Sequence, residues 1–240
     1  MKREWLLVMA AGAWALAACA PATPAQTIEP SFSATAEASV APTSAGTTPA
    51  STPEPIAGAG EVTFRILPDQ SEAWFIIDEV LAGSPNTVIG KTNVVSGMIS
   101  GEFANPQGVF VSPIQIDMSE LRTDNSFRNR AIRDAILQTG DEANRFAIFQ
   151  AVSIEGLPDQ VTFGTAYDLS ITGDLTIHGV TRPVTFTATA TPVSESRLEG
   201  TASVTVDYAD FDIHILRLPE QVASVGQLVT LGIDFVAEKE

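Results

Sequence analysis

Cysteine is almost absent from this chain of 240 residues, which has only Cys19. A single cysteine cannot form an intramolecular disulfide, so the fold must be stable without one. Basic residues are also scarce, with 13 Lys and Arg against 29 Asp and Glu and a formal net charge of −16. Binding to phosphates requires a basic face, so we expect no nucleic-acid partner. The acidic balance also disfavours close binding to anionic lipid head groups.

Common sequence signals of catalysis are missing. There is no phosphate-binding glycine loop and no G-x-S-x-G motif. The two histidines, His178 and His214, have no histidine or cysteine nearby at metal-ligand spacing. In "DYADFDIH", Asp210 and Asp212 alternate as acids do on a solvated strand face. We therefore expect no catalytic residue, no metal and no cofactor, the alternative being zinc held by both histidines and an aspartate across a barrel.

The N-terminal residues have the pattern of a secretory signal. Lys2 and Arg3 precede an apolar run that is too short for a stable transmembrane helix. The run ends in "LAAC", which resembles the bacterial lipobox, where the cysteine receives a lipid and becomes the mature N-terminus. We predict a lipoprotein signal peptide over residues 1–18 and lipidation of Cys19, an ordinary signal peptide being the alternative.

Residues 19–60 consist almost wholly of Ala, Pro, Thr, Ser and Gly. Such a segment cannot bury enough apolar surface to offset the entropy of the chain, and its prolines favour extended conformations. We predict a disordered tether here and one domain over residues 61–240. The protein is then expected to be exported and anchored through its lipid at the extracytoplasmic face of a bacterial membrane.

The expected domain is all-β. Alternating apolar and polar residues recur along it, and Thr, Val, Ile and Phe dominate the alternating segments. Turn residues separate them at short intervals, as in an antiparallel barrel or sandwich of about eight strands. The segments are "VTFRI", "EAWFIID", "SGMISGEF", "GVFVSPIQIDM" with a break at Pro113, "RFAIFQAVSI", "VTFGTAYDLSITGDLTI", "RPVTFTATATPV", "LEGTASVTVDYADF" and "QLVTLGIDFVA".

One segment, residues 124–138, has apolar residues at helical spacing and predicts an inserted helix. Asp124 or Asn125 can cap its start and Gly140 can end it. Arg130 and Asp134 are four residues apart and can pair on its exposed face.

This helix allows two interpretations. Phe127 and the arginines could form an anion-binding helix, or Phe127 and Ile132 could dock it while the arginines stay in solvent. The second interpretation is favoured.

Two motifs resemble those of the YceI-like, polyisoprenoid-binding family. The run "GDLTIHGVTRPVTF", residues 173–186, matches the family's "G-x-L-T-I-x-G-V-T-x-P-V". "LRTDNSFRNRAIRDAIL" is similar to its looser "S-I-x-T-x-x-x-x-R-D-x-x-L". The likeness covers residues 62–238, but Asp78 occurs where many members have the histidine of "F-x-I-x-H", before a longer connection rich in Gly, Pro and Asn.

The resemblance implies a lipocalin-like, extended antiparallel barrel that holds a long isoprenoid, such as a polyprenol or an isoprenoid quinone, and no enzyme activity. The head group would lie at a mouth near Arg128, Arg130 and Arg133. The apolar residues expected to face the lumen are Phe64, Phe75, Ile77, Ile99, Phe103, Val111, Ile116, Phe149, Leu175, Phe186, Val204, Val206, Leu231, Ile233 and Phe235.

Other functions stay open at this point. The domain could be a non-binding structural or interaction module with a filled core, or an envelope enzyme or electron-transport accessory that uses His178 or His214. The oligomeric state is open as well, a homodimer included.

The motif at residues 173–186 is expected to be a hairpin. Leu175 and Ile177 should face one side, and Gly179 allows the tight turn. His178 is then a residue of the surface or rim, and Arg182 is solvated. Pro183 should start the return strand, where its missing N–H is tolerated.

Overall fold

The computed structural model describes residues 60–215, 220 and 222–240. The predicted signal peptide at 1–18, the lipidation of Cys19 and the tether as far as residue 59 lie outside the described residues. Within the described part, no helix has both the length and the apolar character needed to cross a membrane.

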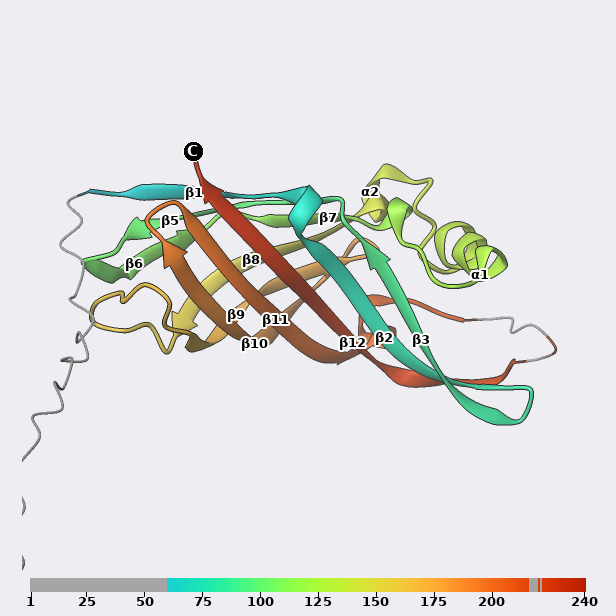
Figure 1. Cartoon of the computed structure of the whole chain (residues 1–240). Helices are drawn as coiled ribbons and strands as arrows, with labels where there is room; N and C mark the ends of the chain where they lie inside the picture. The colour runs from blue at the N-terminus through green and yellow to red at the C-terminus, as the bar shows by residue number, and fades with distance from the viewer. Residues whose placement is uncertain (1–59, 216–219, 221) are drawn as a thin grey trace, which may run out of the picture. The chain divides into compact units, whose positions relative to one another are not determined.

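Twelve strands of the described residues form a single antiparallel sheet that curls into an extended barrel (Figure 1). The all-β, lipocalin-like fold class is thereby confirmed, but the sheet has twelve strands where about eight were expected. Most of the order follows the chain, with β7 to β12 as consecutive neighbours. The strands are β1 (Val62–Ile66), β2 (Glu72–Leu81), β3 (Ser84–Thr92), β4 (Val95–Ser96), β5 (Met98–Glu102), β6 (Asn105–Val111), β7 (Ile114–Asp117), β8 (Phe146–Glu155), β9 (Tyr167–Ile177), β10 (Val180–Ser194), β11 (Arg197–Asp207) and β12 (Val222–Lys239).

The segment from β4 to β5 connects the two sides of the curled sheet. Strand β4 pairs with β7, whereas β5, which follows directly, pairs with β1. Gly97 lies at the change of partner, where a Cβ would come within 2.4 Å of the side chain of Ile114. A 3-10 helix, Pro68–Gln70, similarly separates β1 from β2, and both strands pair with β12.

Strand β3 was not expected, because its segment is rich in Gly, Pro and Asn and indicates a connection. It forms a hairpin with β2 through Ala82 and Gly83, whose φ angles are 49° and 79°. Two successive positive φ angles suit the right-handed twist of a tight hairpin. Pro85 is tolerated because, in the described residues, β2 is the only strand paired with β3.

Two other segments differ from the expected strands. Strand β9 begins only at Tyr167, and the preceding Val161 is a buried loop residue whose N–H donates to the carbonyl of Phe103. After β11, Tyr208–Phe211 forms a 3-10 helix capped by the side chain of Asp207. Phe211 is fully buried there, so Asp210 and Asp212 do not alternate along a strand as predicted.

The inserted helix is shorter than predicted and continues as a π-helix. Helix α1 (Ser126–Ala131) begins after Asn125, whose side chain accepts from two backbone N–H groups, so this predicted cap is confirmed. A π-helical turn, Ile132–Ile136, follows. The left-handed residue after it is Gln138 with φ 50°, and not Gly140 as expected.

Two features near this helix were not predicted. A second helix, α2 (Glu142–Arg145), leads directly into β8. Asp134 pairs with its neighbour Arg133, with Nε and Oδ1 2.8 Å apart, and not with Arg130.

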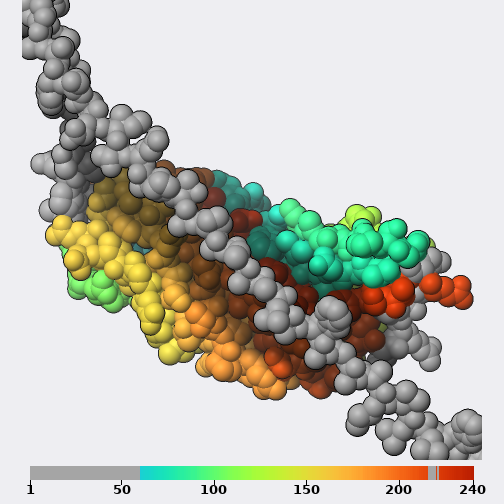
Figure 2. Space-filling view, turned by 90° about the horizontal axis from the view of Figure 1, so that it is seen from below, coloured from blue at the N-terminus to red at the C-terminus, as the bar shows by residue number. Residues whose placement is uncertain are grey.

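The far end of the barrel from α1, where β5 and β6 lie in Figure 1, has a filled core. Phe64, Phe103 and Phe163 stack edge to face there, with centroid distances of 6.1 and 5.1 Å. Ala237 of β12 is fully buried in the same cluster. On the outer surface, β2 and β3 lie beside β12 (Figure 2).

Candidate functional site: two joined apolar cavities

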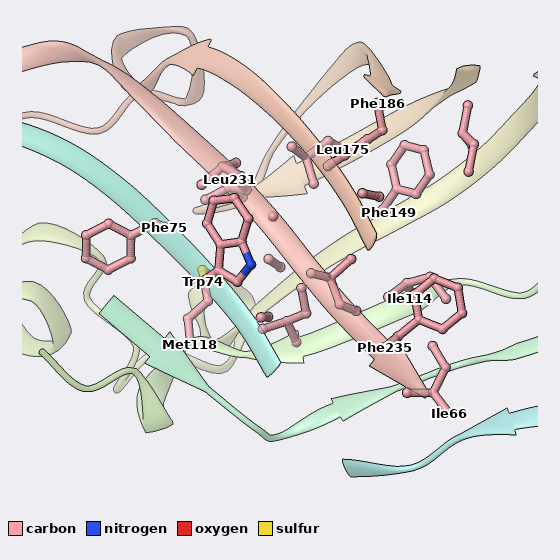
Figure 3. A pocket seen from close by; sticks show the side chains of 18 of the residues that line it. Ile66, Trp74, Phe75, Ile114, Met118, Phe149, Leu175, Phe186, Leu231 and Phe235 are labelled. Atoms are coloured by element: carbon pink, nitrogen blue, oxygen red, sulfur yellow. The ribbon is translucent and has the colours of Figure 1, made fainter. Parts of the chain in front are cut away.

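A narrow cavity of about 180 Å³ occupies the middle of the barrel. Figure 3 shows its side chains approaching from strands on opposite sides, with Phe75 and Leu231 on one side and Phe149 and Phe186 on the other. Phe149 and Phe186 pack edge to face with their centroids 4.8 Å apart. Residues at alternating positions of these strands face inward, which makes the lining apolar.

A wider cavity of about 590 Å³ lies between the β2–β3 hairpin, the start of β12 and α1. The two cavities share lining residues, so they lie side by side in the barrel. A volume of this size lies within the range of small-molecule binding pockets, about 300 to 1,000 Å³. The shared residues are Phe75, Met118, Leu121, Ile177 and Leu231.

Three inward-facing phenylalanines lie over glycines of the neighbouring strand. A Cβ on each glycine would clash with the ring, so the glycine allows the ring to lie flat against the sheet. All three rings also line the narrow cavity. The pairs are Phe75 over Gly90 (2.1 Å from the added Cβ), Phe149 over Gly173 (2.7 Å) and Phe235 over Gly200 (2.7 Å).

One charged cluster borders the wide cavity. Arg128 of α1 and Glu79 of β2 form an ion pair, with Nη2 and Oε1 2.9 Å apart. Their side chains are 19% and 5% exposed. The Asn86 amide also donates to Glu79 Oε1, at 2.9 Å, and Asp124 pairs with the other guanidinium nitrogen of Arg128. Buried charges persist when they are paired and hydrogen-bonded, and this cluster meets that condition.

Most of the predicted lumen residues line these cavities. Phe64 and Phe103 are exceptions, because they belong to the filled core at the other end. Val204 shares the inward face of β11 with Ala202 and Val206 but borders neither cavity. The residues at the cavities are Phe75, Ile77, Ile99, Val111, Ile116, Phe149, Leu175, Phe186, Val206, Leu231, Ile233 and Phe235.

The predicted mouth arginines separate in the structure. Arg128 borders the wide cavity, whereas Arg130 is exposed and Arg133 is engaged with Asp134. The favoured docking interpretation is wrong in two respects. Phe127 is 81% exposed at the edge of the wide cavity, and Arg128, not Phe127, is directed inward.

Glu79 was not expected at the site, although its position on the inward face of β2 indicates that it is buried. Ala73, Phe75 and Ile77 occupy alternate positions of β2, and Glu79 is the next residue on the same inward face. An acidic side chain in an apolar series requires a buried partner. The sequence does not identify that partner, because Arg128 lies 49 residues further along the chain.

A second ion pair supports the region where the cavities join. Asp117, next to Met118, accepts from Arg145 of α2 at 3.0 and 2.7 Å and from the backbone and hydroxyl of Ser119. Burial would raise the pKa of Asp117, but the hydrogen bonds from Arg145 and Ser119 outweigh it and hold the pKa below its usual value. The carboxylate therefore stays ionised and connects β7 with α2.

His178 differs from the expected rim residue. It shares the β9–β10 turn with Gly179, and their φ angles are 51° and 72°. Both ring nitrogens are buried and have no hydrogen-bond partner in the described residues. A general base needs an orienting group, and none is within hydrogen-bonding distance of this ring in the part of the chain described.

The remaining polar candidates are exposed in the described part of the chain. His214 contacts Asp212 at 3.1 Å, and both side chains are largely exposed. Residues 60–215, 220 and 222–240 contain no group of three or more His, Cys, Asp or Glu that could hold a metal ion. Arg182 is exposed and donates to the carbonyl of Thr181.

Comparison with known proteins places this barrel among related domains. The family model described as the YceI-like domain matches residues 64–237. Two proteins from Pseudomonas putida strains, each called UPF0312 protein, are 32% identical to the chain over 126 residues. The match covers 49% of this chain and 59% of each relative.

Solved structures show the same fold at low sequence identity. A polyisoprenoid-binding domain from Saccharophagus degradans, implicated in plant cell wall breakdown, is 16% identical with a TM-score of 0.57. It covers 74% of this chain and 98% of its own. BcnA of Burkholderia cenocepacia is 16% identical with a TM-score of 0.54, covering 71% of this chain and 98% of that one.

Proposed function

Because this chain belongs to the YceI-like family, we propose that it binds a long isoprenoid, such as a polyprenol or an isoprenoid quinone, or a similar apolar chain, inside its barrel. The proposal is for binding without catalysis. Binding of polyisoprenoids by the similar domain from Saccharophagus degradans supports it.

The observation that carries the proposal is the pair of adjacent apolar cavities in the barrel. They have volumes of about 180 and 590 Å³ and share five lining residues, and nearly all the lining side chains are apolar. Each buried methylene contributes about 0.8 kcal/mol before ordering costs. A long chain can therefore bind tightly in this interior with few polar contacts.

The N-terminal sequence supports a membrane-anchored, extracytoplasmic location as part of the proposal. The lipobox-like "LAAC" would attach the protein through a lipid on Cys19, and residues 20–60 would hold the barrel away from the membrane. We expect Cys19→Ala to move the protein from the membrane fraction to the soluble fraction. A variant that stays in the membrane fraction would contradict lipid anchoring.

The binding proposal is tested by titrating the full, delipidated chain with a polyprenol. Leu231→Trp should fill the point where the cavities meet and weaken binding at least tenfold, because Leu231 lines both. Leu228→Trp on the same strand is the matched control, since Leu228 is 61% exposed and borders neither cavity. Absence of saturable binding to the unmodified chain would exclude the proposal and favour a non-binding module.

A further inference from the structure

The charges around the wide cavity indicate which head groups the ligand can carry. This inference rests on the proposed isoprenoid binding. Arg128 is the only basic residue among the described residues that line either cavity. Its guanidinium is already engaged by two carboxylates, Glu79 at 2.9 Å and the neighbouring Asp124. The cluster therefore carries one positive and two negative charges.

Both carboxylates of this cluster accept hydrogen bonds within it. Arg128 donates to Glu79 through Nη2 and to Asp124 through Nη1, and the Asn86 amide donates to Glu79. An anionic head group that took the place of Glu79 on the guanidinium would have to displace this carboxylate. The displaced Glu79 would then be a buried, unpaired charge, which is unfavourable.

From this arrangement we infer that the barrel selects ligands with an uncharged head group and discriminates against anionic ones. A phosphate or fatty-acid carboxylate at the wide cavity would lie beside the buried, weakly screened carboxylate of Glu79 and near the exposed carboxylate of Asp124. A neutral hydroxyl or carbonyl has no such repulsion and can hydrogen-bond to Tyr208, whose side chain lines the same cavity. The class of ligand is thus a long apolar chain ending in an alcohol or a quinone ring.

The test compares two ligands with the same tail, geranylgeraniol and geranylgeranyl monophosphate, by equilibrium titration of the delipidated full chain. We expect the alcohol to bind at least tenfold more tightly. Equal or tighter binding of the phosphate by the unmodified chain would overturn the inference while leaving the proposed function intact. If neither ligand binds, the proposed function fails and the inference falls with it.

Charge-removing variants add a second readout. Glu79→Gln should increase the affinity for the phosphate at least fivefold relative to the affinity for the alcohol. Asp124→Asn should act in the same direction without endangering the fold, because the Asp124 side chain is 82% exposed. Glu72→Gln is the matched control, since Glu72 belongs to the same strand as Glu79 but pairs with Lys91 at the surface. Phosphate affinity that is unchanged in both Glu79→Gln and Asp124→Asn would contradict the inference.

Discussion

The two ends of the barrel use the same residue types with opposite results. At the end of β5 and β6, phenylalanines stack on one another and fill the interior. Toward α1, phenylalanines such as Phe75 lie flat over glycines, and the interior stays open. The difference shows that aromatic content alone does not decide whether a barrel is filled. At the open end, the residue opposite the Phe75 ring is Gly90.

The filled end should show the largest effect on stability. Phe103→Ala removes a ring packed against both Phe64 and Phe163, and large aromatic truncations in a core cost about 3 to 5 kcal/mol. Ile77→Ala at the open end should cost clearly less, because Ile77 already borders a cavity. Urea unfolding measures both. Equal losses would show that the two ends are packed alike.

The ion pair between the ends should have the next largest effect. Asp117→Asn weakens the charge-assisted hydrogen bonds with Arg145, and such bonds contribute about 1.5 to 3 kcal/mol each. Because the pKa of Asp117 is lowered in the folded state, its contribution is present above about pH 4 and is lost as the pH falls through the folded value. Urea unfolding at pH 7 and at lower pH should show this loss in the unmodified protein and less of it in the variant. A variant with the same pH dependence as the unmodified protein would show that Asp117 does not cause the loss of stability at low pH.

Gly90→Ala should make the open end resemble the filled one. The added Cβ would meet the Phe75 ring at 2.1 Å and push it toward the point where the cavities join. Overpacking of this kind costs about 1 to 3 kcal/mol, and we expect weaker binding of long apolar ligands. Gly140→Ala is the control, because nothing lies within 4 Å of its added Cβ. Unchanged polyprenol affinity in Gly90→Ala would show that flat rings are not needed for the cavity.

The smallest effect is expected at the hairpin that borders the open end. Ala82 has a φ of 49°, a conformation that costs residues with a Cβ about 1 to 2 kcal/mol. Ala82→Gly should therefore stabilise the protein by roughly 0.5 to 1 kcal/mol once the greater entropy of glycine in the unfolded chain is included. Thermal unfolding measures the change. A lower melting temperature would mean that Ala82 is not strained in the turn.

The sequence was sufficient to predict those elements that depend on residues close together in the chain. Alternating residues predicted most of the strands, and the capping residue Asn125 marked the start of α1. Strand β3 was missed because Pro85 and Gly90 weaken its pattern, although the proline lies on an open edge and the glycine accommodates a ring. The direction of Phe127 was wrong because the pairing of Arg128 with Glu79 turns the arginine, and not the phenylalanine, toward the barrel.

By itself the sequence determined an all-β domain, the inward face of most strands and membership of a family recognisable from residues 173–186. Only the tertiary structure decided that one end is filled, that the other end is open, and that Glu79 and Arg128 meet beside the opening. The physical reason is the distance along the chain between the residues that determine each feature. Strand periodicity depends on neighbouring residues, whereas a cavity depends on which side chains lie opposite one another across strands distant in the chain.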